Sequence, residues 1–374
     1  MSKSLARNKK LDYSLFAIIA IIVIIGIVIL SSVSAAFAFK KYGDTYYLLK
    51  HQIVFGLLPG LFLGFLAYKL KLSFFKKISG PFLLSALILM LLVFLPGIGS
   101  SSGEAARWIR VGPLSFQPSE ALKLAFIIYL AAWLGNRLER IKQNKESNFW
   151  GTFLSFLFVL GAIIVLLFCQ SNASTLFVIA AVGAIMYFSI NTPVIHTIIM
   201  ILFGGGIGFW IIKAAPYRAN RWLIFLNPDM DPMGKGYQLQ QALIAVGSGG
   251  IGGMGPGMSA QKFGALPQTI SDSIFAVFAE EMGFIGAAVL IIIFLIFLWR
   301  GLDVVKNSQD NFSKLLALGI TSWIIIQTFV NIGAMIGIMP LTGIPLPFIS
   351  YGGSALMMEL IGMGILLNIS KNST

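Results

Sequence analysis

The sequence is poor in charge, in cysteine and in histidine. Charged residues make up 11% of its 374 residues and hydrophobic residues 57%, whereas a soluble domain carries about 25% charged residues. One cysteine, Cys169, and two histidines exclude a disulfide framework and the usual zinc and haem spacings. These shortages exclude a soluble domain, and the mean hydropathy of +0.88 predicts a polytopic membrane protein.

The charge balance is strongly basic, with 27 Lys and Arg against 14 Asp and Glu and a net charge of +13. Binding to nucleic acid would require a basic run interleaved with aromatic residues on a soluble module, and the sequence contains no such run. The excess is typical of membrane topology and of contact with anionic lipid headgroups. We therefore expect no nucleic-acid partner.

Long apolar runs predict an all-α protein with about ten transmembrane helices. The first run follows a basic tail at residues 1–13 and has no small-residue cleavage site after it, so we interpret it as a retained span and not as a signal peptide. The fifth and sixth runs are separated by only a few residues and should form a tight hairpin. The expected spans are residues 14–36, 50–68, 80–97, 118–135, 152–169, 173–190, 193–213, 272–299, 313–337 and 350–369.

Lys and Arg in the short loops predict the orientation of the chain. The tail, the loops near residues 69–77, 137–145 and 300–314, and Lys371 carry sixteen of these residues, against ten on the opposite side. Both termini should therefore be cytoplasmic. The chain is expected to be a single integral membrane domain, residues 1–374, whose residues 214–271 form a large extracellular loop between the seventh and eighth helices.

The predicted outer side carries more cations than the positive-inside tendency favours. Seven of its ten cations lie in two segments, Arg107 to Arg110 and Lys213 to Lys262. One interpretation is an anionic ligand on the outside. The other is contact with phospholipid headgroups or helix ends.

Asp272 is the acid whose position is most informative. It ends the long polar loop and directly precedes the apolar run from Ile274 to Trp299, so it should lie at the mouth of a helix at the outer membrane surface. Acidic side chains at that depth are costly and are usually functional. Asp272 is therefore the candidate catalytic residue.

A second group of polar residues opens the fourth span. Pro118 and Ser119 are helix start signals, and Glu120 and Lys123 at i, i+3 share one face of the helix that follows. The two charges could form a structural pair that neutralises itself within the membrane. Alternatively Lys123, with Arg107 above it, lines a polar cavity for an anionic headgroup.

The last outer segment, residues 337–354, contains three prolines and ends in Gly352 and Gly353. This pattern predicts irregular backbone at membrane depth, which is tolerated only against protein or a watery cavity. Ser350, Tyr351 and Ser354 could supply hydrogen bonds there, so the segment is a candidate substrate wall.

Several features leave two interpretations open. The glycine-rich run at residues 247–257 lacks the strand and the Gly-Lys-Ser/Thr ending of a phosphate loop, and it is either a flexible outer loop or a loop packed against the bundle. Glu359, inside the last span, either pairs with Lys123 or is neutral and hydrogen-bonded. Glu280 and Glu281 follow Asp272 by more than two helical turns, so we interpret them as internal pairs that orient the bundle and not as a second catalytic carboxylate.

These segments together resemble the SEDS family of peptidoglycan polymerases, which includes FtsW and RodA. In order and spacing the resemblance covers about residues 15–370. The matching runs are Ala106–Ile109 with Phe116–Glu120, Asp231–Gln238, Ala245–Gly250, Ser259–Lys262, Leu266–Pro267, Asp272–Glu281 and Leu346–Ser354.

The resemblance implies an inverting glycosyltransferase that polymerises lipid II, the undecaprenyl-pyrophosphate-linked disaccharide pentapeptide, on the outer face of a bacterial cytoplasmic membrane. In the family, the acid that corresponds to Asp272 is the proposed catalytic residue, here a general base for the acceptor hydroxyl. The residues expected to bind the headgroup and pyrophosphate are Arg107, Lys123, Glu120, Arg218, Arg221, Gln261, Lys262, Ser350, Tyr351 and Ser354.

The resemblance also implies partners. A class B penicillin-binding transpeptidase is expected, together with other membrane proteins of the division or elongation complex. The run from Asp272 to Glu281 favours the FtsW-like, septal branch over the elongation branch. A divalent cation, Mg²⁺ or Mn²⁺, would be compatible with a pyrophosphate leaving group, and the sequence assigns it no ligands.

Two departures from the family pattern replace carboxylates by amides. Gln268 stands where the family often has Glu. The hairpin at residues 170–175 reads Gln-Ser-Asn-Ala-Ser-Thr where the family often has Gln-Pro-Asp-x-Gly-Thr. Asp272 is unaffected by both changes, but a role for the hairpin is less secure.

Two other functions remain open from the sequence. A lipid II flippase would explain the cations and the intramembrane Glu120, Lys123 and Glu359 but would not need an acid at the outer surface. A non-catalytic scaffold of the division or elongation complex would need no catalytic residue, and in cells it would tolerate Asp272→Ala.

Overall fold

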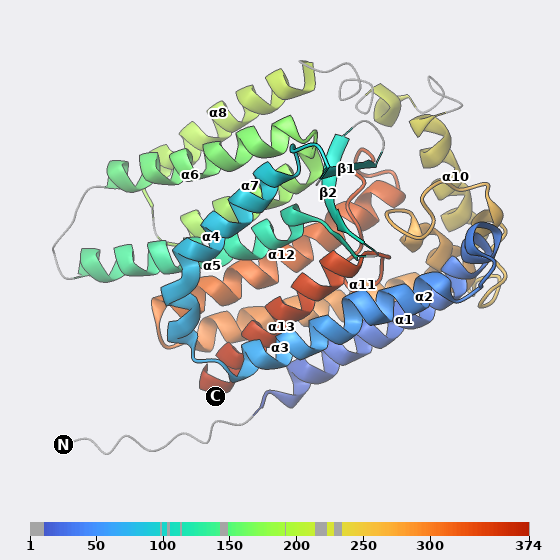
Figure 1. Ribbon diagram of the computed structural model, residues 1–374, viewed down its shortest axis with the longest axis horizontal. Coiled ribbons are helices and arrows are strands. Elements are labelled where there is room, and N and C mark those ends of the chain that lie inside the picture. The colour runs from blue at the N-terminus through green and yellow to red at the C-terminus, as the bar shows by residue number, and fades with distance from the viewer. Residues whose placement is uncertain are drawn as a thin grey trace.

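The computed structural model describes residues 11–97, 99–102, 105–112, 114–142, 149–190, 192–213, 223–227 and 234–373. Its helices lie side by side in one elongated bundle, in which the start of α1 and the end of α13 lie at the same end (Figure 1). The predicted all-α membrane class is confirmed.

The helices of the first half are α1 (Tyr13–Tyr42), α2 (Tyr47–Gln52), the π-helix η1 (Ile53–Leu57), α3 (Leu58–Lys69), α4 (Leu72–Leu92), α5 (Pro118–Lys142), α6 (Phe149–Cys169), α7 (Ala173–Phe188) and α8 (Val194–Lys213). Those of the second half are α10 (Lys235–Ser248), the short 3-10 helix η3 (Gln261–Phe263), α11 (Ile274–Asn307), α12 (Asn311–Met335) and α13 (Gly353–Ser373).

Eight of the described helical segments are long and apolar enough to cross a membrane, and two further apolar ones, Ala173–Phe188 and Val194–Gly206, are shorter. The exact count of ten spans therefore stays a prediction. The largest differences in boundaries concern α11, which ends at Asn307 and not at residue 299, and α4, which begins at Leu72 and not at residue 80. Lys76 and Lys77 were expected in a loop, but they lie in the first turns of α4. A helix can accommodate them there because the long lysine stem packs along apolar surface while its ammonium group reaches the membrane interface.

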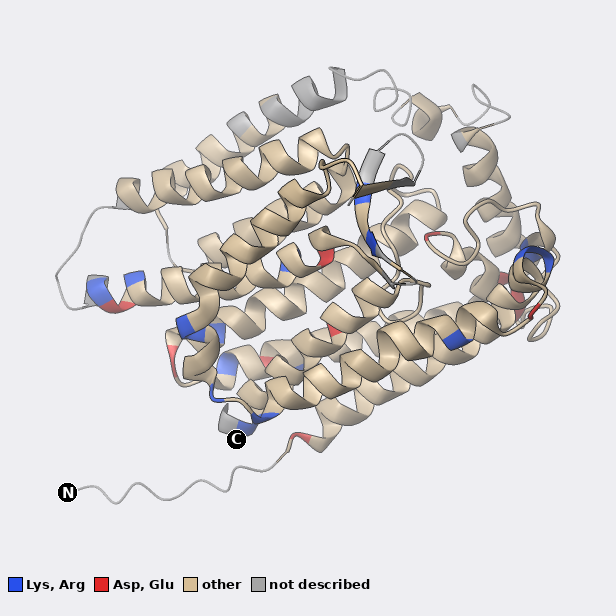
Figure 2. Cartoon of the chain, in the orientation of Figure 1, with Lys and Arg blue, Asp and Glu red and all other residues tan. Residues whose placement is uncertain are grey.

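The bundle has an inner and an outer layer. In α5, α12 and α13, 72%, 72% and 83% of the most apolar window is buried within the protein, compared with 28–33% in the other long spans. The outer helices therefore present their apolar side chains to lipid. Charged side chains gather at the two ends of the bundle, with only a few in its interior (Figure 2). Because an isolated charge within the membrane is costly, those few interior charges mark the functional candidates.

Close backbone contact joins α3 to α13. A Cβ atom on Gly364 would lie 2.0 Å from the carbonyl oxygen of Gly64, and one on Gly60 would lie 2.7 Å from the side chain of Leu360. Small residues allow membrane helices to approach this closely. Because lipid is as apolar as the helix surfaces, such helices associate through dispersion and interhelical contacts and not through the hydrophobic effect. The contact fixes the start of α13, and with it the segment that precedes this helix.

The glycine-rich run packs against a break in α11, which decides between its two interpretations. Gly283 has a left-handed φ of 65° and interrupts the helix, and residues 250–255 supply the missing hydrogen bonds. The amides of Met254 and Gly255 donate to the carbonyls of Glu280 and Glu281 (both 3.0 Å), and the amides of Phe284 and Ile285 donate to Gly250 and Ile251 (2.9 and 3.1 Å). Irregular backbone at this depth is tolerated because its polar groups are satisfied by protein.

The described residues between 99 and 116 form a small sheet that the sequence did not predict. Strands β1 (Gly99–Ser102), β2 (Ala105–Val111) and β3 (Leu114–Phe116) pair antiparallel in the order β1-β2-β3. The sheet lies at the end of the bundle away from the end of α13 (Figure 1). Helices α10 and η3 lie within residues 214–271, so the described part of the predicted large loop is partly helical.

The segment between α12 and α13 is irregular, as its prolines predict. It contains no helix or strand from residue 338 to residue 352, and Leu346, Phe348 and Ile349 are buried. The amide of Phe348 donates to Glu359 Oε2 at 2.8 Å, which agrees with the hydrogen-bonded interpretation of Glu359. The segment is therefore buried against protein and forms one wall of the site described next.

Candidate functional site

A cavity of about 790 Å³ opens among the inner helices, the small sheet and the irregular 338–352 segment. Five of the sequence-predicted site residues line it: Arg107, Glu120, Lys123, Asp272 and Tyr351. They come from β2, the start of α5, the turn before α11 and the turn before α13. The polar residues that also line it are His51, Ser115, Gln117, Ser171, Asn172, Ser174, Thr175, Gln268, Ser271, Gln327 and Thr342.

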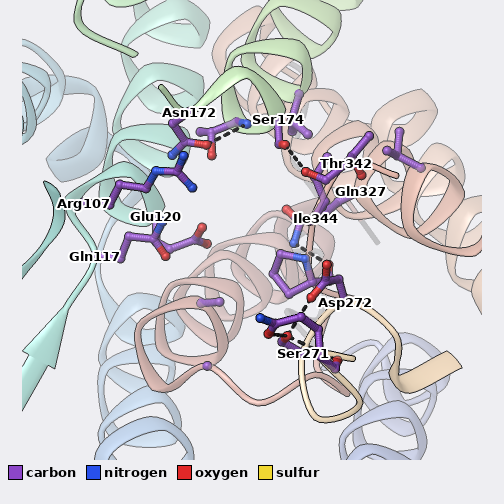
Figure 3. A pocket seen from close by; sticks show the side chains of 18 of the residues that line it. Arg107, Gln117, Glu120, Asn172, Ser174, Ser271, Asp272, Gln327, Thr342 and Ile344 are labelled. Atoms are coloured by element: carbon purple, nitrogen blue, oxygen red, sulfur yellow. Dashed lines mark hydrogen bonds between the residues drawn. The ribbon is translucent and has the colours of Figure 1, made fainter. Parts of the chain in front are cut away.

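The Asp272 carboxylate lies in the wall of this cavity (Figure 3). The residue is 9% exposed, and its Oδ1 lies 2.6 Å from the hydroxyl of Ser271. Its Oδ2 makes no hydrogen bond to the described residues, and it lies 3.6 Å from where a Cβ on Gly343 would be. One carboxylate oxygen is thus oriented by a neighbour, while the other is available to a ligand in the cavity.

The backbone beneath Asp272 is held by α12 and by the irregular segment. The amide of Asn331, in α12, donates to the carbonyls of Asp272 (2.8 Å) and Ile344 (2.7 Å), and its side chain is buried. The hydroxyl of Ser350 donates to the carbonyl of Ser271, and the amide of Tyr351 donates to that of Ile270 at 2.8 Å. These contacts join the Asp272 turn and the 343–351 segment into one unit.

We predict that Asn331→Asp lowers the turnover number of the protein at least about tenfold while the Michaelis constant for its substrate changes less than about threefold. The isosteric carboxylate cannot donate, so two buried carbonyls lose their partners at a cost of about 1–3 kcal/mol each, and the Asp272 turn loses its fixed position. Thr328→Val is the matched control, because the Thr328 hydroxyl bonds only within its own helix, to Ile324. Equal turnover in Asn331→Asp and Thr328→Val would contradict a positioning role.

Glu120 and Lys123 form the expected ion pair, and they also line the cavity. Lys123 Nζ lies 2.8 Å from Glu120 Oε2, with both side chains about 5% exposed. Gln327 Oε1 accepts from Lys123 Nζ and from the indole of Trp323, each at 2.9 Å, and Gln327 Nε2 donates to the carbonyl of Pro345 at 3.1 Å. The expected ion pair is therefore present and both of its residues line the cavity, while binding of an anionic headgroup stays a prediction.

Arg107 joins the small sheet to the hairpin between α6 and α7. Its Nε donates to the carbonyl of Gln170 at 3.2 Å and a terminal nitrogen donates to that of Ser171 at 2.6 Å. Asn172 caps α7 by accepting from the amide of Thr175 at 3.3 Å. Arg107 and the hairpin lie on the side of the cavity opposite Asp272 and Ser271 (Figure 3). The cavity therefore has Arg107 and the Glu120–Lys123 pair on one side and the Asp272 carboxylate on the other (Figure 3).

The structure does not bring the other described candidates to the cavity wall. Lys262 Nζ pairs with Glu281 Oε1 at 3.0 Å and donates to the carbonyl of Gly257 at 2.6 Å, so its charge compensates a buried acid beneath the outer loop. Gln261 also lies outside the lining. Ser350 and Ser354 support the wall from behind: the Ser354 hydroxyl accepts from the amide of Gln117 at 3.1 Å. Arg218 and Arg221 lie outside the described residues.

The residues of the site that were missed from the sequence include His51, Gln327 and Asn331. A signal for two of them was present, because Gln327 and Asn331 are amides at i, i+4 in an otherwise apolar helix and must share one face. His51 precedes the π-helix η1, a feature often found at functional sites, and its Nδ1 lies 3.0 Å from the hydroxyl of Tyr351.

Among the described residues, no group of three or more His, Cys, Asp or Glu side chains could hold a metal ion. Glu120 is paired with Lys123, so Asp272 is the one cavity carboxylate that has no cationic partner among these residues. Mg²⁺ is commonly held by one or two carboxylates together with substrate phosphates. The residues present therefore fit a cation that arrives with an anionic substrate and not a closed resident site.

Comparison with known proteins finds relatives over nearly the whole chain. Residues 12–374 match the model of the FtsW, RodA and SpoVE family, described as cell cycle protein. Stage V sporulation protein E of Bacillus subtilis (strain 168) is 36% identical over 364 residues, which cover 97% of each chain. A probable peptidoglycan glycosyltransferase FtsW of Geobacter sulfurreducens (strain DL-1 / KN400) is 38% identical over 347 residues, covering 92% of this chain and 91% of that one. A chain of a solved peptidoglycan synthase complex, studied for its coordination of polymerization and crosslinking, is similar with a TM-score of 0.77 and 27% identity, covering 97% of this chain and 98% of that one.

Proposed function

Because the chain belongs to the FtsW, RodA and SpoVE family, we propose that it polymerises lipid II into glycan strands with Asp272 as the general base. The protein is a bacterial integral membrane protein and a peptidoglycan glycosyltransferase of cell-wall synthesis. Its substrate is the undecaprenyl-pyrophosphate-linked disaccharide pentapeptide, used both as donor and as acceptor.

The observation that carries the proposal is the placement of the Asp272 carboxylate in one cavity with Arg107 and Lys123. A sugar hydroxyl is a poor nucleophile until a carboxylate within hydrogen-bond reach accepts its proton during attack, and such a base contributes about 10²–10⁴-fold to the rate. Asp272 Oδ2 is the oxygen without a partner among the described residues. It accepts the proton of the acceptor 4-hydroxyl as that oxygen attacks the anomeric carbon of the donor.

The side of the cavity that carries Arg107 and the Glu120–Lys123 pair suits the leaving group. The bond between the anomeric carbon and the pyrophosphate oxygen breaks as the new bond forms, so configuration inverts and negative charge gathers on the departing diphosphate. Arg107 and Lys123 stabilise that charge in a cavity lined by protein, where fixed charges act more strongly than in bulk water. Arg218 and Arg221 are proposed to assist from the outer loop. A divalent cation, when bound, would neutralise further charge on the departing diphosphate, and Asp272 is the cavity carboxylate that would help to hold it.

We place the reaction on the outer face of the cytoplasmic membrane, with both termini cytoplasmic and residues 214–271 extracellular. The excess of Lys and Arg in the loops predicted on the same side of the membrane as the two termini supports this orientation. A class B penicillin-binding transpeptidase is the proposed partner, since a similar chain occurs in a complex that couples polymerization to crosslinking. The FtsW relatives favour the FtsW-like, septal branch over lateral wall synthesis.

Reconstitution tests the proposal. The full chain, purified with its transpeptidase partner and supplied with lipid II, should release undecaprenyl pyrophosphate and form a glycan polymer that a muramidase degrades. Movement of labelled lipid II across a vesicle bilayer without polymer would instead indicate a transporter. A preparation that yields neither result would favour a scaffold.

A further inference from the structure

A row of aromatic rings leads from the cavity to the outer end of α1 and α2. Tyr47, His51 and Phe55 follow one another at i, i+4 spacing and so share one face of the α2–η1 helix. Ring centroids lie 6.5 Å apart for Tyr47 and His51 and 4.7 Å apart for His51 and Phe55. Tyr42, from the last turn of α1, stacks on Tyr47 at 4.1 Å. Tyr351 adds a fifth ring, 5.9 Å from that of His51.

The row begins inside the cavity and ends on the surface. His51, Phe55 and Tyr351 line the cavity, whereas Tyr42 and Tyr47 are 42% and 41% exposed. A tyrosine belt at the membrane interface would account for the two outer rings. It does not account for three rings that face the cavity, nor for the contact of 3.0 Å between the Tyr351 hydroxyl and His51 Nδ1.

The inner end of the row is held in place by neighbouring contacts. Gln52 Oε1 accepts from the amide of Gly352 at 3.0 Å, and its Nε2 donates to the carbonyl of Ser350 at 3.4 Å. These two hydrogen bonds hold the backbone on both sides of Tyr351, so that its ring lies beside His51.

We propose that these five rings, the aromatic ladder of Tyr42, Tyr47, His51, Phe55 and Tyr351, bind the nascent glycan strand as it leaves the cavity. The proposal rests on the polymerase function given above. A polymer that is extended in an enclosed site must leave it along a surface that accepts each repeat in turn. Rings with an apolar face and a polar edge suit sugars, because pyranose C–H groups pack on the face and hydroxyl and acetamido groups bond to the edge.

The chemistry of the ladder matches this occupant in a second way. His51 Nε2 makes no hydrogen bond to the described residues, so that nitrogen can serve a sugar hydroxyl or an acetamido group. A row of stacking platforms that tolerates successive units is also how proteins hold single-stranded nucleic acid without reading its sequence. The ladder should therefore hold the strand between additions and not take part in bond formation.

A binding titration tests the ladder independently of catalysis. The probe is a β-1,4-linked hexamer of N-acetylglucosamine, titrated into the purified full chain. Tyr47→Ala should raise the dissociation constant about fivefold or more, in line with the loss of one aromatic contact. Tyr46→Ala is the matched control, because Tyr46 is the adjacent residue, is 55% exposed and makes no ring contact among the described residues. It should change the constant less than twofold.

A second readout is strand length. In reactions with lipid II, Tyr47→Ala should shorten the mean strand severalfold while the rate of the first coupling stays within about twofold, since the reacting groups are untouched. Equal binding of the hexamer by the parent and Tyr47→Ala, absence of binding by the parent, or equal shortening by Tyr46→Ala would overturn the ladder. If hexamer binding depends on Tyr47 but no polymer forms, the ladder stands and the proposed polymerase function fails.

Discussion

Replacing Asp272 by Asn is expected to reduce lipid II polymerisation by roughly 10²–10⁴-fold, the contribution of a general base. The amide has nearly the same shape, and its oxygen can still accept from the Ser271 hydroxyl that lies 2.6 Å from Asp272 Oδ1. It cannot accept the proton of the attacking hydroxyl. The measurement is the initial rate of polymer formation by the purified complex, with and without Mg²⁺ or Mn²⁺, alongside the binding of lipid II.

Binding of lipid II should change little in the same variant, because the cations that face the diphosphate remain. Asp44→Asn is the matched control: Asp44 is another acid near the end of a helix, but it pairs with Lys50 at 2.8 Å at an exposed site outside the cavity. Its rate should stay within about twofold of the parent, as expected for an exposed pair of small energetic value. Full polymerisation by Asp272→Asn would contradict the assignment of Asp272 as the general base. Loss of lipid II binding in this variant would show that Asp272 acts in substrate binding.

Much of the architecture could be predicted because lipid imposes simple rules on sequence. A chain must satisfy its backbone internally in the membrane, so the apolar runs had to be helices. An acid at the mouth of such a helix had to be either paired or functional. Asp272 was predicted as the candidate on that ground, and the structure places it in the cavity wall. The prolines of residues 337–354 predicted the irregular segment beside it.

The contacts that position Asp272 could not be predicted, because they join segments far apart in the sequence. Asn331 contacts the Asp272 turn from α12, and Ile344 lies beside it in the following segment. A local sequence pattern does not specify which backbone carbonyls accept hydrogen bonds from a buried amide. The small sheet that carries Arg107 was missed for a related reason. Its three short strands are stabilised by pairing with one another, which propensity alone does not specify.

The assignment of charges shows the same limit. Arg107, Lys123 and Lys262 were all candidates for the diphosphate, with Arg107 and Lys123 ranked first, since each is a cation in a segment expected near the outer face. In the structure Lys262 lies beside Glu281, beneath the loop that fills the break in α11. Which acid a buried cation meets depends on how the helices pack, and here the acid, Glu281, lies just before the break in α11 at Gly283.

The protein contains two ion pairs that are buried to a similar degree, Glu120–Lys123 and Lys262–Glu281. Their separations are 2.8 and 3.0 Å, and the side chains are 4–6% exposed. Removing one partner of such a pair leaves an uncompensated buried charge and costs about 3–5 kcal/mol, whereas replacing both partners by apolar or neutral groups is often nearly neutral. Lys123→Met and Lys262→Met should therefore both lower the melting temperature strongly.

The double replacements should separate the two pairs by function. Glu120→Gln with Lys123→Met, and Glu281→Gln with Lys262→Met, are both expected to recover most of the melting temperature lost by the single Lys variants. Only the first should remain deficient in polymerisation, by about 10²-fold or more, because a cation facing the departing diphosphate is lost from a preorganised site. The second should polymerise lipid II at a rate near that of the parent.

Thermal melts in detergent and initial rates on lipid II, taken on the same preparations, supply both readouts. Equal activity in the two double variants would mean that Lys123 serves only to neutralise Glu120 in the membrane. Equal loss would mean that the Lys262–Glu281 pair is also needed, through the loop that it fixes. A rate deficit confined to the Glu120–Lys123 double variant, at matched stability, would establish that the cavity pair acts on the substrate, because both proteins would then have lost the same kind of buried charge.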